Sequence, residues 1–212
     1  MEGKGKKEQI LEAAMSLILK NGYSHTSVED ITNSIGIAKG SFYTYFKSKN
    51  LLLRTIIEEQ IESIIEQQES QLKEGKDFDE ILLNNIVSRV KFLKKDLKRQ
   101  LVLINLARNV DVLGKEVRDL MVKMETINYN FIKKLLNRYN SQLKLTENEM
   151  DQYSQIINFI IRGFKMANVF FDDNGEDNFF IKDIAEAEKR INHKSFDEGI
   201  EFMYKSILKM LK

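Results

Sequence analysis

The sequence predicts an all-α protein made of a small N-terminal three-helix unit and a larger C-terminal helical domain. Its 212 residues include no proline, the residue that most often interrupts a helix. Apolar side chains recur at intervals of three and four along most of the chain, which is the period of an amphipathic helix. The first helical patterns are short and the later ones are long. We therefore expect one domain over residues 1–47 and a second over residues 48–212.

The first expected helix runs from about Lys6 to Lys20. Its apolar stripe consists of Ile10, Ala13, Ala14, Leu17 and Ile18. Asn21 and Gly22 follow, and glycine suits the left-handed conformation that often ends a helix. One face of this helix can therefore contribute to a small core.

Two short helices with a tight turn between them are expected next. The first covers about Ser27 to Ser34, and Thr26-x-x-Glu29 predicts a capping box at its start. Gly36 breaks this helix, and the second covers about Ala38 to Tyr45. This is the layout of a helix-turn-helix, in which one side of the second helix is buried and the other offers hydrogen-bond donors to a nucleic acid.

A long helix is expected from about Lys49 to Lys73, with Ser48 as its cap. At 1.5 Å per residue it would be about 35 Å long. It begins beside the helix-turn-helix and continues into the second domain, and no glycine-serine linker interrupts it. We expect it to act as a lever between the two parts.

The rest of the chain is expected to be helical. Acidic residues 147 and 149 follow Thr146 in the manner of a helix start, and the acidic stretch 172–177 is expected to be a loop. The expected helices cover about Phe78–Leu93, Leu97–Asn109, Leu113–Asn140, Glu147–Phe171, Phe179–Ile191 and Ser195–Leu211.

Two of these helices predict self-association. The Glu147–Phe171 helix is apolar almost all round, and the last helix carries apolar residues at alternating spacings of four and three. One chain of this size cannot cover both faces, so we expect a homodimer joined by a four-helix bundle. The expected interface residues are Ile156, Ile160, Gly163, Ala167, Ile200, Met203 and Ile207.

The stretch from Thr26 to Leu51 resembles the DNA-binding segment of the TetR family of bacterial repressors. The resemblance covers about a quarter of the chain. The sequence departs from the family pattern at Ala38, where the family often has a Ser or Thr cap, and at Asn50, where an acidic residue is common. The matching residues are Thr26, Val28, Ile31, Ile35, Gly36, Ile37, Lys39, Gly40, Phe42, Tyr43, Tyr45, Phe46, Lys49 and Leu51.

The resemblance implies contacts to double-stranded DNA from the second helix of the motif. Each polar residue there, taken alone, is more simply an exposed side chain of a small helix. Together with the turn and the aromatic pair Phe42 and Phe46, which we assign to the core, they favour DNA contact. The predicted DNA-binding residues are Thr26, Ser27, Lys39, Gly40, Ser41, Tyr43, Thr44, Tyr45 and Lys49, of which Lys49 is expected to hold a phosphate.

The resemblance also implies a small effector within the second domain. The many Phe and Met residues there suit an adaptable apolar pocket, so an apolar or amphipathic effector is expected. The simpler interpretation is that each aromatic fills a core and each polar side chain faces solvent. The predicted effector contacts are Phe92, Asn105, Arg108, Met124, Asn128, Phe131, Phe159, Arg162 and Met166.

Composition and charge limit the other functions. Residues 1–54 contain eight basic and five acidic side chains although the whole chain has a net charge of +1, and this local excess suits phosphate contact. There is no cysteine, no apolar run approaches about 18 residues, and a cytoplasmic location is expected. His25 and His193 lie far apart, and the acidic stretch lacks calcium-loop spacing, so we expect no metal and no cofactor.

We therefore expect a homodimeric transcriptional regulator that binds a palindromic operator and is released from it by a small molecule. A ligand-dependent activator is one alternative, and a helical dimeric interaction module that keeps the helix-turn-helix only for its fold is another. A helical enzyme is a third, but the chain offers no cysteine nucleophile, paired histidines or glycine-rich phosphate loop.

Overall fold

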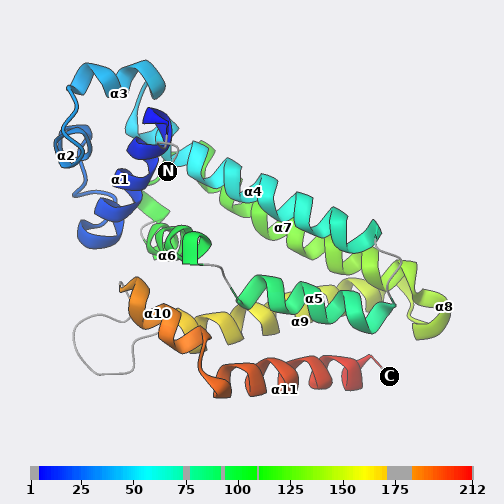
Figure 1. Ribbon diagram of the computed structural model, residues 1–212. Helices are drawn as coiled ribbons and strands as arrows, with labels where there is room; N and C mark the ends of the chain where they lie inside the picture. The colour runs from blue at the N-terminus through cyan, green and yellow to red at the C-terminus, as the bar shows by residue number, and fades with distance from the viewer. Residues whose placement is uncertain (1–4, 74–76, 92–93, 109, 171–182, 212) are drawn as a thin grey trace. The chain divides into compact units, whose positions relative to one another are not determined.

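The computed structural model describes residues 5–73, 77–91, 94–108, 110–170 and 183–211, and every element within these ranges is helical (Figure 1). The predicted all-α class is confirmed. The chain divides into two compact units, which we describe separately. Unit 1 comprises residues 1–62 and 95–122, and unit 2 comprises residues 63–94 and 123–212. Within the described ranges, no helix combines the length and apolar character needed to cross a membrane.

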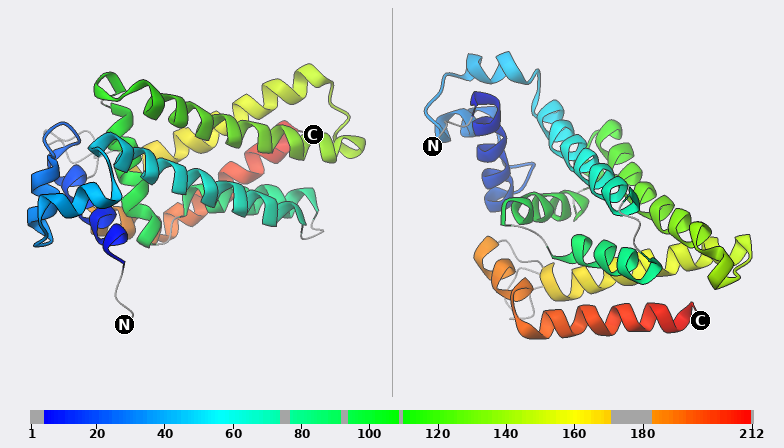
Figure 2. Two further views of the ribbon diagram at one scale, coloured as in Figure 1. Left: turned by 90° about the horizontal axis from the view of Figure 1, so that it is seen from above. Right: turned by 45° about the vertical axis from the view of Figure 1, so that its right-hand side comes forward.

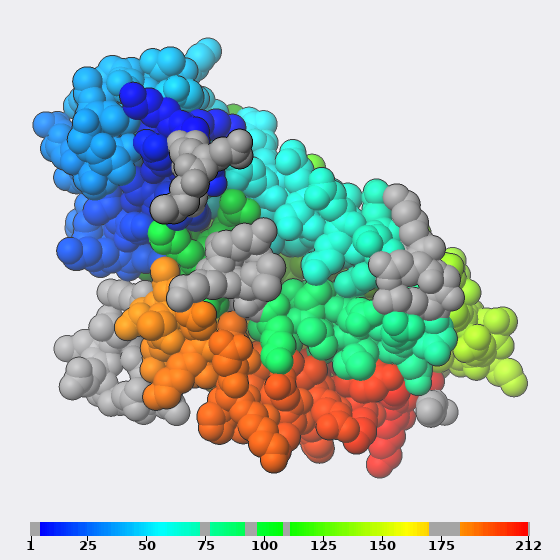
Figure 3. Space-filling view, in the orientation of Figure 1, coloured from blue at the N-terminus to red at the C-terminus, as the bar shows by residue number. Residues whose placement is uncertain are grey.

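Unit 1 is organised around the three N-terminal helices, α1 (Lys6–Asn21), α2 (Val28–Ser34) and α3 (Lys39–Tyr45). Contacts join α1 to α2 and α2 to α3, and the space-filling view shows these segments packed as one body (Figure 3). The first part of α4 (Lys49–Lys73) and most of α6 (Lys94–Arg108) complete the unit, followed by the short turn η1 (Val110–Val112).

The core of unit 1 is apolar. Each of its large side chains contributes about 1.5–3 kcal/mol relative to an exposed one. Ion pairs hold α6 at its edge: Lys98 Nζ lies 3.0 Å from Glu12 Oε2 on α1, and Arg99 Nη2 lies 2.9 Å from Glu59 Oε2 on α4. The most buried core residues of the first four helices are Ile10, Ala14, Ile18, Ile31, Phe42, Leu52, Leu53, Ile56 and Ile57.

Unit 2 is a bundle in which α11 (Lys194–Met210) packs on α5 (Phe78–Val90) and α9 (Glu147–Lys165), as two views show (Figures 1 and 2). The second half of α4 and most of α7 (Lys115–Arg138) also belong to it. The short α8 (Asn140–Leu143) connects α7 to α9, and α10 (Ile184–Ile191) precedes α11.

The helix boundaries confirm much of the sequence prediction and correct the rest. Ser48 Oγ accepts from the Leu51 amide at the start of α4, and a capping box between Thr146 and Glu149 starts α9, both as expected. The capping box of α2 is instead formed by Ser27 and Asp30, one residue later than predicted. The helix expected to reach Phe171 becomes the π-helical segment η2 (Met166–Phe170) after Lys165.

Two glycines in unit 2 differ in their surroundings. A Cβ added to Gly199 of α11 would lie 2.8 Å from Cε2 of Phe164 on α9, so this glycine permits the close packing of α11 on α9. A Cβ added to Gly163 of α9 would meet nothing within 4 Å. Gly163 therefore serves no close contact within unit 2.

Candidate nucleic-acid interface

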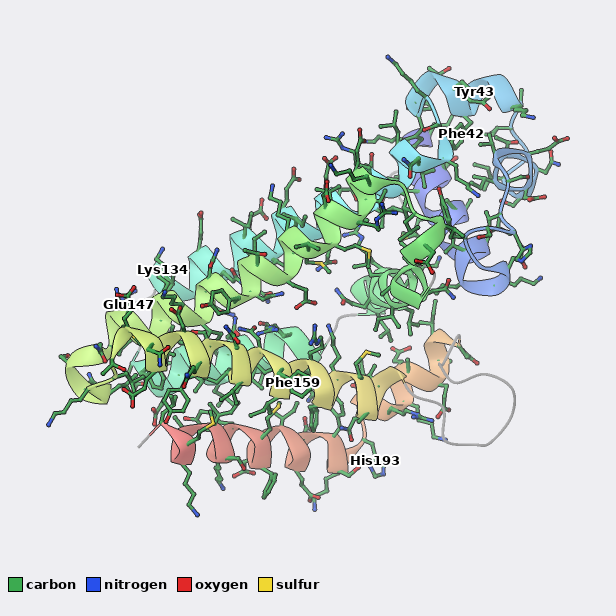
Figure 4. The ribbon with its side chains drawn as sticks, turned by 180° about the vertical axis from the view of Figure 1, so that it is seen from behind. Phe42, Tyr43, Lys134, Glu147, Phe159 and His193 are labelled. Atoms are coloured by element: carbon green, nitrogen blue, oxygen red, sulfur yellow. The ribbon has the colours of Figure 1, made fainter. Side chains whose placement is uncertain are left out.

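Helix α3 presents two opposite faces. Phe42 is fully buried, whereas Tyr43 and Tyr45 are 50% and 43% exposed. Figure 4 shows Tyr43 on the outer side of α3 and Phe42 below it. Lys39, Gly40 and Thr44 are also exposed, and Ser41 is half-buried. Most of the residues predicted on α3 are therefore exposed, as contact with another molecule requires.

The buried face of α3 fixes its orientation. The ring centroids of Phe42 and Phe46 lie 5.7 Å apart, and the Tyr43 ring meets the Phe42 ring edge-on at 5.4 Å. Gly36, in the turn before α3, has φ 66°, a left-handed conformation that glycine adopts without strain. Ala38 begins α3 without a side-chain cap, so packing rather than capping stabilises this helix.

Gly40 and Lys39 at the start of α3 both face open space. A Cβ at Gly40 would meet nothing within 4 Å, so the chain itself does not require a glycine there. Glycine at this place allows another molecule to approach the backbone closely. Lys39 Nζ lies 3.5 Å from Glu29 Oε2 in an exposed pair that water screens strongly. Its ammonium can exchange this partner for a phosphate at little cost.

The backbone amide of Thr26, a predicted DNA contact, donates to the Tyr23 carbonyl at 3.3 Å. The Thr26 side chain is fully buried, because its hydroxyl donates to the Gly22 carbonyl at 2.8 Å and so satisfies the end of α1. Ser27 is exposed, as a contact requires, but its hydroxyl donates to Asp30 Oδ2 at 2.6 Å. The hydrogen bonds from the Ser27 side chain and amide lower the pKa of Asp30.

Lys49 has a different position from the one expected of a phosphate ligand. Its ammonium donates to the carbonyl of Tyr23 at 2.8 Å and to the carbonyl of Thr26 at 2.7 Å, and lies 4.1 Å from the centroid of the Tyr23 ring. Burial lowers the pKa of Lys49, and the charge of Asp30 opposes this shift. Lys49 therefore ties the first turn of α4 to the loop between α1 and α2.

The predicted effector contacts are distributed over both units of the structure. Phe92 and the side chain of Arg108 lie outside the described residues, and Asn105 belongs to unit 1. In unit 2, Asn128 and Phe131 are buried, and Asn128 Oδ1 accepts from Gln68 at 3.2 Å. Met124 and Met166 are half-buried.

Phe159 and Arg162 line an open hollow of about 580 Å³ in unit 2. The Arg162 guanidinium lies 5.6 Å from the centroid of the Phe159 ring, which is 66% exposed. The other lining residues are Glu125, Thr126, Tyr129, Gln155 and Ile156. Of the predicted effector contacts, these two alone line this hollow.

Three of the predicted dimer contacts face the interior of their own chain. Ile200, Met203 and Ile207 are at most 4% exposed, because the apolar seam of α11 faces the interior of unit 2. Ile156 and Gly163 of α9 and Ala167 of η2 are exposed, and Ile160 is half-buried. The prediction that α9 is buried all round is wrong within one chain.

Sequence reasoning missed Phe202, which is 75% exposed on α11. It lies outside the apolar seam of its helix, and a large apolar residue at such a position indicates an exposed apolar side chain. It also missed Arg89 and Lys165, which are charged and only half exposed, and Asn85, a buried polar residue of α5.

A compact three-helix unit whose last helix buries an aromatic side and exposes donors defines a DNA-binding regulator of the helix-turn-helix type. Comparisons with known proteins agree. The sequence model described as "Bacterial regulatory proteins, tetR family" matches residues 10–56. The HTH-type transcriptional regulator YvdT of Bacillus subtilis (strain 168) is 27% identical over 191 residues, which cover 88% of this chain and 94% of that protein.

An HTH-type transcriptional regulator in the lacX 3′ region of Lactococcus lactis subsp. lactis is 30% identical over 145 residues, 67% of each chain. A solved TetR transcriptional regulator from Legionella pneumophila covers 100% of both chains with a TM-score of 0.70 and 17% identity, a likeness of fold. The chain belongs to the TetR family of transcriptional regulators. Proteins of this family bind DNA to regulate transcription and are not enzymes, so the alternative of a helical enzyme is set aside.

Proposed function

We propose that this regulator is a homodimeric repressor that binds a palindromic operator and leaves it when a small molecule binds. In this proposal residues 1–47 contact the DNA, and residues 48–212 hold the effector and the dimer interface. The observation that carries the proposal is the exposed face of α3, where Tyr43 and Tyr45 lie beside Lys39 while Phe42 is fully buried. A helix of this kind enters a major groove with its exposed donors toward the bases and phosphates.

The proposed DNA contacts come from α3 and its flanks. Lys39 and Tyr43 would bind phosphates, and Ser41, Thr44 and Tyr45 would approach the groove. Ser27 would lie at the edge of the same surface. Gly40 would allow the backbone of α3 to come close to the DNA.

Lys49 would act indirectly in this proposal. Two of its three donors are engaged by the carbonyls of Tyr23 and Thr26. We therefore propose that Lys49 positions α2 and α3 against α4 and that phosphate binding is not its main role. A movement of α4 would then reach the DNA-binding helices through this contact.

The proposed dimer uses the outer faces of α9 and α11. Ile156 is 43% exposed and Phe202 is 75% exposed, which is unusual for side chains of this size. At helical spacing Ile160 and Gly163 share one side of α9 with Ile156, and exposed Ala167 follows in η2. Small residues there would let a partner helix approach closely, and Phe202 would supply buried area. A two-fold dimer would present two α3 helices, and successive major grooves on one face of DNA lie about 34–36 Å apart.

Selection of bound duplexes from a random library tests this proposal. It should recover an inverted repeat, and sedimentation should give two chains or a multiple of two per duplex. A reporter gene controlled by the genomic promoter that carries this repeat should rise in expression when the regulator gene is deleted. A fall in expression would make the protein an activator, and recovery of a single unrepeated half-site would contradict the dimeric mode of binding.

A further inference from the structure

Four charged side chains from three helices interact within unit 2. They are Arg89 of α5, Glu125 of α7, and Arg162 and Lys165 of α9. Lys165 is repelled by Arg89 and Arg162 and attracted by Glu125. Counted over these described groups, three positive charges face one negative charge. We call these four residues the cationic cluster.

Burial makes the cationic cluster costly. It lowers the pKa of Arg89 to about 10, and repulsion by Arg162 adds to this shift while Glu125 opposes it. Burial also lowers the pKa of Lys165 to about 8, together with repulsion by Arg89 and Arg162 and against the attraction of Glu125. Both groups still carry their charge at pH 7. By solvent exposure Arg89 and Lys165 are half-buried, and Glu125 and Arg162 are exposed. Like charges held close together destabilise a fold, and such arrangements are typical of binding sites.

A neutral side chain orients Arg89. Arg89 Nη1 donates to Asn158 Oδ1 at 2.6 Å, and Asn158 Nδ2 donates to the Ser154 carbonyl at 2.7 Å. The amide fixes the direction of the guanidinium without neutralising it. The charge of Arg89 therefore remains available to a ligand.

Buried acceptors lie on the neighbouring helices. Asn85, one turn before Arg89 on α5, is 1% exposed, and its Oδ1 has no hydrogen-bond partner among the described residues. The same holds for Oε1 of Gln71 on α4, which is 8% exposed and whose Nε2 donates to Ser88 on α5 at 3.4 Å. Buried acceptors without partners are uncommon in folded proteins. An amide oxygen accepts hydrogen bonds and an ionised carboxylate offers no donor, so these two oxygens are not part of an anion site.

The cationic cluster adjoins the open hollow of unit 2, because Glu125 and Arg162 belong to both. The apolar side of this hollow consists of Ile156 and Phe159, and Figure 4 shows Phe159 on α9. A ligand in the hollow would thus meet positive charge at one end and apolar side chains at the other.

We infer that unit 2 binds an amphipathic anion, a small molecule whose carboxylate or phosphate is held by Arg89, Arg162 and Lys165 and whose apolar body lies along Phe159. This inference rests on the proposed function, because it assigns the chemistry of the proposed effector. Guanidinium groups match carboxylates and phosphates through paired hydrogen bonds, and the ammonium of Lys165 adds a point charge.

Calorimetric titration of the full-length protein with three matched ten-carbon probes tests the inference. Decanoate carries the acid, decan-1-ol is its neutral counterpart, and decylammonium reverses its charge. Decanoate should bind at least ten-fold more tightly than decan-1-ol, and decylammonium should be the weakest of the three. Hexanoate and hexadecanoate extend the comparison to shorter and longer bodies.

Two variants assign the anion to the cationic cluster. Arg89→Met and Lys165→Met should each weaken decanoate binding at least ten-fold and leave decan-1-ol binding within two-fold. Arg89→Lys keeps the charge and should recover part of the affinity, which separates loss of charge from loss of packing. A bound anion raises the pKa of Lys165, so the protein should take up protons when decanoate binds at pH 8. The uptake appears as a dependence of the binding heat on the ionisation enthalpy of the buffer. Lys165→Met should lose this uptake.

Equal affinities for decanoate and decan-1-ol, or no binding of any of the three carboxylates, would overturn the inference. Fluorescence titration of the selected operator separates this result from a failure of the proposed function. If decan-1-ol binds as well as decanoate and releases the DNA, ligand-released repression is supported and the inference of an anionic effector is wrong. If decanoate binds through the cationic cluster but the operator affinity is unchanged, the anion site is supported and ligand-released repression is wrong.

Discussion

Units 1 and 2 satisfy their buried polar groups in different ways. In unit 1 the buried hydroxyls of Thr26 and Thr32 donate to carbonyls three or four residues earlier in the chain. In unit 2 Gln68 pairs with Asn128, and Arg89 pairs with Asn158, across 60 and 69 residues. Unit 1 also has long-range charged contacts, from Lys98 to Glu12 and from Arg99 to Glu59, so the contrast concerns the two threonines of the helix-turn-helix segment and not the whole unit. In the proposed function, the helix-turn-helix holds a fixed surface and unit 2 takes the effector.

Phe42→Ala should produce the largest effect on the rigid side of this comparison. The ring is fully buried and lies 5.7 Å from the Phe46 ring, so its removal should cost about 3–5 kcal/mol of unfolding free energy. DNA binding should be lost with the fold of the helix-turn-helix. Melting curves beside operator titration check this. Tyr43→Ala, next to it but half exposed, is the control and should melt close to wild type.

Lys49→Ala should have the next largest effect on stability. Two hydrogen bonds from an ammonium to carbonyls would be lost, at about 1.5–3 kcal/mol for a charged donor. Because the proposed role is structural, the slope of the logarithm of affinity against the logarithm of salt should stay at its wild-type value. A slope reduced by about one, with an unchanged melting temperature, would return Lys49 to the set of phosphate ligands.

Phe202→Asp sharpens the contrast between the inner and outer faces of α11. Its ring is exposed in one chain, so the substitution should leave each chain folded, but a charge in the proposed interface should weaken dimerisation at least ten-fold. Sedimentation with circular dichroism measures both properties. Met203→Asp, one residue further and buried, should unfold unit 2 instead. A Phe202→Asp dimer as tight as wild type would remove α11 from the interface.

Lys165 should give the smallest effect, a dependence of stability on pH. Its pKa is about 8 in the folded chain and 10.5 ordinarily, so the unfolded chain binds more protons between these values and stability should rise with pH across this window. Below pH 8 Lys165 is charged in both the folded and the unfolded chain, so the folded chain bears the full free-energy cost of burying this charge. Lys165→Met should therefore melt above wild type at pH 7.5, and the difference should narrow by pH 9.5. Parallel pH profiles for the two proteins would contradict this assignment.

The parts of the fold that depend on neighbouring residues could be predicted from the sequence. The turn at Gly36, the buried Phe42 and the α9 cap at Thr146 follow from spacing and local chemistry, and all three are observed. The α2 capping box was placed one residue early because Thr26 and Ser27 both fit the pattern. Only the turn toward Gly22, which buries the Thr26 side chain, decides between them.

The candidate site was less predictable where it depends on long-range packing. The seam of Ile200, Met203 and Ile207 has the period of an interface, but periodicity does not tell whether a helix packs on its own chain or on a partner. Arg89 and Lys165 come together only through the packing of α5 on α9. Lys49 was assigned to a phosphate because the carbonyls that engage it lie 23 and 26 residues earlier.

Salt-dependent titration of the selected operator with Lys39→Ala and Lys134→Ala tests the central claim most directly. Both lysines are exposed, Lys39 at the start of α3 and Lys134 on α7 of unit 2, where Figure 4 labels it. If α3 binds the DNA, Lys39→Ala should raise the dissociation constant and reduce the salt slope by about one, whereas Lys134→Ala should change neither. Identical affinities and slopes for the two variants would contradict the placement of α3 on the operator.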